Sequence, residues 1–190
     1  MIKKLKNVAE IIFCILEKGN EEKKLLTAAN LLEDNQISKI DIDSKFKKDK
    51  SVIIKKNDIL LKRINPTYVN FINCIKDEIY AGNNLIIIRP KTIDAKYLAA
   101  ILNNNIEKFT KNNSIGAIVP SIGRKEIEEF EIKICNKEQQ ILLGKYWLKS
   151  VEKRVLESKK LELEKQKSIA IINKLINEIG GNKNDWFRRY

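Results

Sequence analysis

Short apolar runs separated by turn residues predict a series of strands between residues 52 and 90. The runs are Val52–Ile54, Ile59–Ile64, Tyr68–Ile72 and Leu85–Arg89. Asn57-Asp58, Asn65-Pro66 and Gly82-Asn83-Asn84 provide the turn signals between them. The last run is apolar without alternation and ends at Pro90, which is typical of a buried strand.

The pattern changes to a helical one after residue 94. Asp94 predicts an N-cap for a helix from Ala95 to about Ile106, whose apolar face holds Tyr97, Leu98, Ile101 and Leu102. Residues 112–123 hold two glycines and a proline and predict a loop. A short amphipathic segment follows, and residues 131–134 predict a last strand. The first 40 residues mix short apolar runs with polar breaks, and residues 27–32 fit a strand end or a helical turn.

A long helix is predicted in the last quarter of the chain. Residues 145–179 contain no glycine and no proline, and strong helix formers dominate. Seven apolar positions follow one heptad pattern: Leu148, Val151, Val155, Ile169, Ile172, Ile176 and Ile179. Polar residues interrupt this stripe at its centre, where Leu156 and Leu163 mark an adjacent stripe. A partner helix explains so long a stripe better than packing along the chain's own domain.

The end of this helix is predicted at Gly180-Gly181. The last residues, 182–190, include Trp186-Phe187-Arg188-Arg189-Tyr190. This aromatic and basic tail fits either a docking element or a frayed end.

Composition excludes several classes of site. The chain has no histidine, which excludes a Ser–His–Asp triad, a Cys–His pair and any His-ligated metal. The three cysteines are far apart and none lies in a CxxC pair, so reduced thiols are expected rather than zinc or disulfides. No segment resembles a signal peptide or a membrane span. We therefore expect a cytoplasmic protein that has no membrane contact.

The net charge of +12 is concentrated in one region. Residues 45–63 hold eight basic and two acidic residues. Such a patch suits contacts with phosphates, and it suits a solvated lysine-rich hairpin equally well. The few arginines among many lysines, isoleucines and asparagines also fit a coding bias toward A and T.

No catalytic motif is evident. Asn65-Pro66-Thr67-Tyr68 is similar to the Asn/Asp-Pro-Pro-Tyr motif of amino-group DNA methyltransferases, but it lacks the second proline and a preceding glycine-rich cofactor motif. A proline turn between two strands is the better interpretation. No P-loop is present, and the acidic run Glu126–Glu131 fits a solvated face better than a metal site. The sequence predicts neither a cofactor nor a metal.

The order of these elements resembles one half of a type I restriction–modification specificity subunit. The matching segments are Asn57-Asp58-Ile59-Leu60-Leu61, Leu85-Ile86-Ile87-Ile88-Arg89-Pro90, Tyr97-Leu98, residues 116–122, residues 127–134 and Glu138-Gln139-Gln140. The stretch that contains them, from Asp58 to Ile179, covers about two thirds of the chain. Asn57 stands where the family usually has glycine, and Cys135-Asn136 stands where it usually has prolines.

The resemblance implies an α+β protein: a small mixed α/β target recognition domain followed by a long coiled-coil-type helix. The corresponding boundaries are a DNA-binding domain at 1–136, a spacer and dimerisation helix at 137–181, and a tail at 182–190. It also implies a non-catalytic subunit that binds double-stranded DNA and DNA adenine methyltransferase subunits, with restriction subunits as a further partner. With one copy and no internal repeat, the chain is expected to pair with itself or with another fragment. The antiparallel homodimer that reads a split site is the preferred expectation.

Candidate DNA-binding residues are basic or amide side chains at strand ends and in loops. They are Lys47, Lys48, Lys62, Arg63, Lys91, Asn112, Asn113, Arg124 and Lys125. Lysines would contact phosphates, and arginine or amide groups would read bases in the major groove. The competing hypothesis is a coiled-coil interaction protein, a remnant or a decoy, which binds methyltransferase subunits without binding DNA.

Overall fold

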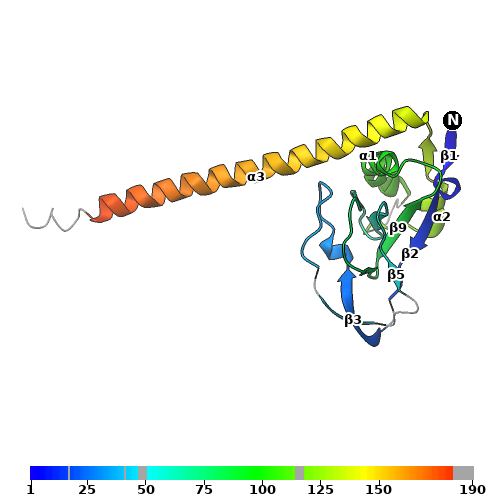
Figure 1. Cartoon of the computed structure of the whole chain (residues 1–190), viewed down its shortest axis with the longest axis horizontal. Helices are drawn as coiled ribbons and strands as arrows, with labels where there is room; N and C mark the ends of the chain where they lie inside the picture. The colour runs from blue at the N-terminus through cyan, green and yellow to red at the C-terminus, as the bar shows by residue number, and fades with distance from the viewer. Residues whose placement is uncertain (17, 41, 47–50, 114–117, 182–190) are drawn as a thin grey trace, which may run out of the picture. The chain divides into compact units, whose positions relative to one another are not determined.

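The computed structural model describes residues 1–16, 18–40, 42–46, 51–113 and 118–181 (Figure 1). The chain divides into two units, Met1–Val151 and Glu152–Tyr190. The strands are β1 (Ile2–Lys4), β2 (Ala9–Phe13), β3 (Lys18–Leu26), β4 (Ile42–Phe46), β5 (Val52–Ile53), β6 (Ile59–Lys62), β7 (Val69–Phe71), β8 (Ile79–Ala81), β9 (Leu85–Pro90) and β10 (Glu131–Lys133). The helices are η1 (Leu5–Asn7), η2 (Ala28–Asn30), α1 (Ala95–Asn113), α2 (Arg124–Glu129) and α3 (Lys137–Gly181).

A four-stranded antiparallel sheet in the order β2-β9-β6-β7 forms the centre of the first unit. Its two middle strands, β9 and β6, are buried on both faces. Successive residues therefore enter two different cores: Ile59, Leu61, Ile86 and Ile88 in one, and Leu60, Leu85 and Ile87 in the other. This double burial explains why both segments are apolar without alternation.

Each face of the central sheet has its own cover. On one face, Leu98 and Leu102 of α1, Ile127 of α2 and Leu5 of η1 complete the first core. On the other face lies a second sheet in the order β4-β3-β8-β5, in which β3 and β8 are parallel. Leu26 and Ala81 from this sheet complete the second core. The unit is thus built of three layers, with helices, central sheet and second sheet in succession.

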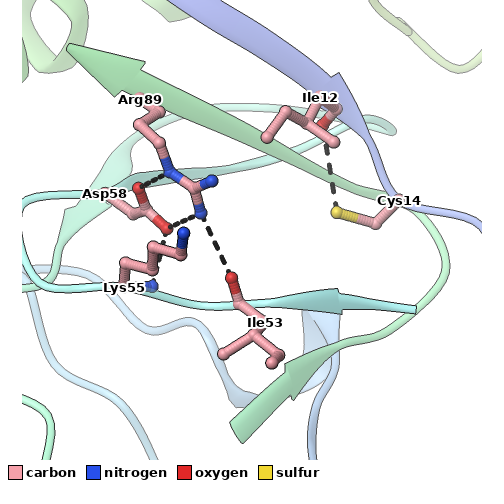
Figure 2. Close-up of polar contacts among 6 residues, drawn as sticks. All are labelled: Ile12, Cys14, Ile53, Lys55, Asp58 and Arg89. Carbon is pink, nitrogen blue, oxygen red and sulfur yellow. Dashed lines mark hydrogen bonds and ion pairs between the residues drawn. The ribbon is translucent and has the colours of Figure 1, made fainter. Parts of the chain in front are cut away.

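A buried ion pair joins the two sheets at one end of the central sheet (Figure 2). The Asp58 carboxylate is fully buried and accepts two hydrogen bonds from Arg89, both of 2.8 Å. It also accepts the Lys55 backbone N–H at 2.7 Å. Arg89 Nη2 donates a further bond of 3.1 Å to the Ile53 carbonyl of β5. The hydrogen bond to the paired carboxylate raises the pKa of the Arg89 guanidinium, so this group stays charged.

The N-terminal segment contacts β10 and the end of α2. β1 pairs with β10, and Lys4 and Lys6 both form ion pairs with Glu129 at the end of α2. These contacts lower the pKa of the exposed Glu129 carboxyl to about 2 from an ordinary value of 4.5, chiefly through the hydrogen bond from Lys4.

The first turns of α3 are part of the first unit. Gln140 connects them to the start of α1: its Oε1 accepts the Asp94 N–H at 3.0 Å and its Nε2 donates to the Cys135 carbonyl at 2.9 Å. A Cβ on Gly144 would lie 2.7 Å from the Tyr97 backbone nitrogen. Only glycine therefore allows this close approach of α3 to α1. No helix in the described ranges is both long and apolar enough to span a membrane.

The predicted α+β fold with a long C-terminal helix is confirmed, and so are the strands predicted from 52 to 90. Asp94 caps α1 as predicted, by accepting the Tyr97 N–H at 2.9 Å. The predicted end of α1 is wrong. The helix continues to Asn113 because Ile106 and Thr110 remain on its buried face, and Asn112 and Asn113 therefore lie in a helix rather than in a loop.

Replacing Asp58 with alanine is expected to lower the free energy of unfolding by about 3 kcal/mol, because it leaves the half-buried Arg89 guanidinium and the Lys55 N–H without their partner. Asp77→Ala is the matched control. Its ion pair with Lys24 is largely exposed and contributes at most about 1 kcal/mol. Urea unfolding at one fixed protein concentration measures both values. Equal effects of the two substitutions would contradict the structural role of Asp58.

Glu129→Gln is expected to destabilise the protein in a pH-dependent way. The folded-state pKa lies below the ordinary value, so the contribution of Glu129 is fully present above about pH 4.5 and is lost as the pH falls toward about 2. The difference in urea midpoint between the two proteins should therefore shrink over this range. It should also shrink in 1 M salt, since the pair is exposed. A difference that is constant from pH 7 to pH 2 would be inconsistent with this ion pair.

Candidate nucleic-acid interface

One end of the central sheet gathers loops that carry basic residues. At this end β2 finishes at Phe13, β9 begins at Leu85 and β6 finishes at Lys62, and the registers Phe13↔Ile86 and Lys62↔Leu85 hold the three ends side by side. We call it the Phe13 end. The opposite end contains Pro90 and the Asp58–Arg89 pair.

Two arginines lie against the ring of Phe13. The guanidinium carbon of Arg124 is 4.7 Å from the ring centroid, and that of Arg63 is 6.0 Å from it. Arg124 also donates to the Ile11 carbonyl at 3.3 Å and forms an ion pair with Glu128 at 3.4 Å. Both arginines are exposed. The aromatic face orients their guanidinium groups while leaving N–H donors open to solvent.

Backbone hydrogen bonds hold the two arginine-bearing loops together. The Arg63 N–H donates to Asn84 at 2.8 Å, and the Arg63 carbonyl accepts from Ile122 at 3.0 Å. Asn65, with a positive φ of 48°, donates its N–H to Pro120 at 2.7 Å. Segments that are some 60 residues apart in sequence thus form one surface, with Arg63 in the loop after β6 and Arg124 at the start of α2.

This arrangement suits binding of an anion or a guanine. Guanidinium groups stay charged at all relevant pH values and donate two parallel hydrogen bonds to a phosphate or to the O6 and N7 atoms of guanine. Because their positions are fixed before binding, less conformational entropy is lost on contact.

Lys62 and Tyr68 have structural partners in the same region. Lys62 Nζ donates to the Tyr68 hydroxyl at 2.9 Å, and that hydroxyl donates to the Leu31 carbonyl at 2.8 Å. The segment Asn65–Tyr68 is therefore the turn between β6 and β7, as the sequence predicts. Tyr68 packs against the second core instead of facing an open pocket.

The other candidates are spread over the first unit. Lys125 is exposed and follows Arg124 in α2, whereas Lys91 follows Pro90 at the opposite end of the central sheet. Asn112 and Asn113 are exposed in the last turn of α1, and Asn113 donates to the Phe109 carbonyl. Lys47 and Lys48 lie outside the described residues. The structure thus brings together Arg63 and Arg124 and separates Lys91 from them.

Phe13 is the residue that sequence reasoning missed. It reads as one member of a short apolar run, and nothing in the sequence indicates that two distant arginines share its ring. Cys14, the next residue, is buried, and burial raises the pKa of its thiol to about 12. A thiolate nucleophile is therefore not available there. Within the described ranges, no group of three Cys, Asp or Glu side chains could hold a metal ion.

The predicted helix–helix positions fall into two groups. Leu148 and Val151 are buried in the first unit, and Leu148 belongs to the first core. These two side chains are thus already used by the chain's own domain. Val155 is half-buried, whereas Ile169, Ile172 and Ile176 are each about half exposed. The side chain of Ile179 lies outside the described part of the structure.

Comparisons with solved structures identify the fold. A chain from a structure that addresses complex assembly and conformational transition of the type I restriction–modification system matches 94% of this chain, with a TM-score of 0.69 and 13% identity. The HsdS subunit from Thermoanaerobacter tengcongensis matches 85% of this chain, with a TM-score of 0.56 and 15% identity. The fold is that of a type I specificity subunit. No protein-family model and no curated protein matches the sequence.

The chain spans about half the length of the specificity-subunit structures that it matches, since the matches cover 49% and 39% of those chains. The residues that carried the sequence resemblance have structural roles in this specificity-subunit fold. Asp58 and Arg89 form the buried ion pair, and Gln140 attaches α3 to α1. The resemblance therefore depends on residues that hold the fold, while the arginine pair at the Phe13 end lies outside most of them.

Proposed function

We propose that this chain is a DNA-reading subunit that positions methyltransferase subunits on a split DNA site, and that it is not itself catalytic. The observation that carries the proposal is the pair of arginines that lie against Phe13, one in the loop after β6 and one at the start of α2, in a domain with the specificity-subunit fold. Lysines elsewhere on this basic chain would add sequence-independent phosphate contacts.

The proposed partners follow from this fold. DNA adenine methyltransferase subunits, and restriction subunits with them, would supply the chemistry that the chain lacks. One of the similar structures addresses assembly of a type I restriction–modification complex, which supports this choice of partner. The second DNA-reading domain that a split site requires would come from a second copy.

The exposed face of α3 supports an antiparallel pair. Ile171 lies 29 residues after Leu142, and Leu175 lies 29 residues after Tyr146. This spacing is about eight helical turns, so all four residues share one face. Each of them is at least half exposed. An antiparallel pair with its twofold axis between residues 158 and 159 places Leu142 opposite Leu175 of the second copy, and Tyr146 opposite Ile171.

Charges on the same face fit the same alignment. Between the two apolar ends lie Lys153, Glu157, Lys160 and Glu164, at helical spacings that keep them on this face. The antiparallel alignment places Lys153 opposite Glu164 and Glu157 opposite Lys160. A parallel alignment in register would place each charge opposite its own copy. Ile169, Ile172 and Ile176 are exposed too, but they lie about 90° to 150° around the helix from the centre of this face and so belong to a different stripe.

The alternative function is an interaction protein without DNA affinity. It keeps the apolar ends of α3 as its contact with other subunits, and it leaves the arginine pair as an ordinary surface feature. Duplex binding distinguishes the two functions.

We expect the full chain to bind duplex DNA in a salt-dependent way, and the double variant Arg63→Ala/Arg124→Ala to bind more weakly. Each lost phosphate contact should lower the slope of log affinity against log salt by about 0.9. Fluorescence anisotropy with a labelled duplex of mixed sequence, titrated at several salt concentrations, measures both quantities.

Lys56→Ala/Lys91→Ala is the matched control, because it removes two exposed charges near the opposite end of the central sheet. It should change the slope less than the arginine variant does. If this control loses more affinity for duplex than the arginine variant does, DNA binds at the Asp58–Arg89 end instead. If the wild-type chain has no affinity for duplex even with a methyltransferase subunit bound, the alternative function is correct.

A charge exchange tests the antiparallel pairing. Lys153→Glu/Glu157→Lys keeps the composition and the ion pair of these two residues within the helix. In the antiparallel alignment it places like charges opposite each other, so dimer affinity should fall roughly tenfold. Adding Lys160→Glu/Glu164→Lys restores opposite charges and should restore affinity. Sedimentation velocity over a concentration series measures the dimer dissociation constant, and a quadruple variant as weak as the double variant would contradict this alignment.

A further inference from the structure

An open groove of about 790 Å³ lies between α1, the α2–β10 junction and the start of α3. Its apolar lining comes from all three: Tyr97, Ile101 and Phe109 from α1, Phe130 from the junction, and Leu143 from α3. The rings of Phe109 and Phe130 meet edge to face, with centroids 4.8 Å apart. Aromatic and aliphatic walls of this kind favour an aromatic occupant.

The groove has a hydrogen-bonded tyrosine in its lining and charged residues at its rim. The Tyr97 hydroxyl donates to the Lys133 carbonyl at 2.6 Å, and burial raises the pKa of this phenol to about 12. The rim carries two carboxylates and two ammonium groups, together with two amide side chains: Glu129, Glu131, Lys108, Lys133, Asn105 and Asn112. Glu129 is already paired with both Lys4 and Lys6. Glu131 faces Lys4 across the β1–β10 pair and its charge acts on Lys4, but no ion pair within 4 Å joins it to another described residue. Glu131 is therefore the rim carboxylate that is open to a cationic ligand.

The antiparallel alignment of α3 brings a suitable segment to this groove. With the twofold axis between residues 158 and 159, Gly181 at the end of α3 in one copy lies opposite Asn136, just before the start of α3 in the other. The nine residues from 182 to 190 extend to at most about 30 Å. They include Trp186, Phe187 and Tyr190, with Arg188 and Arg189 between them. Three aromatic side chains match the apolar lining, and the arginines match Glu131.

We propose that residues 186–190 of a second copy dock in this groove, with Trp186 or Phe187 against the ring pair of Phe109 and Phe130 and an arginine on Glu131. The inference rests on the antiparallel pairing under the proposed function. It assigns to the tail the role of a clasp, which fastens the end of each α3 helix to the domain of the other copy.

Photo-crosslinking tests the location of the tail. The probe is the full chain with benzoylphenylalanine in place of Phe187, as an equal mixture of isotopically light and heavy protein, at a concentration where the wild type is dimeric. The expected result is crosslinked peptides that join light and heavy chains and map to residues 97–112 or 129–143. Light–light and heavy–heavy pairs alone would place the tail on its own chain and overturn the inference.

Two further outcomes separate this inference from the proposed function. A dimer whose crosslinks map away from the groove overturns the clasp and leaves the pairing of α3 intact. A protein that stays monomeric in sedimentation at every concentration overturns the pairing, and the clasp with it.

Substitutions provide an independent measurement. Trp186→Ala/Phe187→Ala should raise the dimer dissociation constant about tenfold, since it removes the apolar part of the contact. Lys183→Ala/Asn184→Ala, in the same segment, is the matched control and should have little effect. Glu131→Lys should weaken the dimer about twofold to fivefold, and Arg188→Glu/Arg189→Glu should restore it. Equal dissociation constants for all these variants would overturn the clasp.

Discussion

Two strands that are buried on both faces determine how the first unit is built. β6 and β9 place alternate side chains in two cores, so neither face of the central sheet can be left to solvent. One face requires the helices and the other requires the second sheet, because exposing either set of isoleucines and leucines would forfeit its burial energy. The Asp58–Arg89 pair lies at one end of these strands and joins the two sheets. The loops at the opposite end and the outer surfaces of the helices are not needed for this packing, so they are available for binding.

The residues that carry the resemblance to specificity subunits are also the ones that hold the first unit together. Asp58 must be an acid because it accepts three hydrogen bonds in a fully buried position. Gln140 uses both ends of its amide, and nearby Gly144 allows α3 to approach the start of α1. These side chains hold the fold, which explains why the resemblance reports the fold and does not extend to the arginine pair at the Phe13 end.

Features with a local sequence signal could be predicted, whereas features that depend on contacts between distant segments could not. Four strands between 52 and 90 were predictable, because apolar runs and turn residues are local signals, whereas the short β8 was not predicted. The last two turns of α1 were not, because three asparagines hid the buried positions of Ile106 and Thr110. The meeting of Arg63 and Arg124 on Phe13 depends on tertiary structure alone. The heptad stripe was real as a pattern, but a pattern cannot show that Leu148 belongs to the chain's own core.

Helix α3 illustrates how one element can serve two purposes with different faces. Leu148 and Val151 attach its first turns to the domain, so the apolar stripe that includes them is already in use there. The face with Leu142, Tyr146, Ile171 and Leu175 is still exposed, and its charged centre gives the proposed pairing a unique register. A slip of one heptad would place Lys153 opposite Ile171 in one direction and Glu164 opposite Tyr146 in the other. Each slip therefore leaves a charge against an apolar side chain. In this pairing the apolar ends provide affinity, and the charges between them select the alignment that brings each tail to the groove of the other copy.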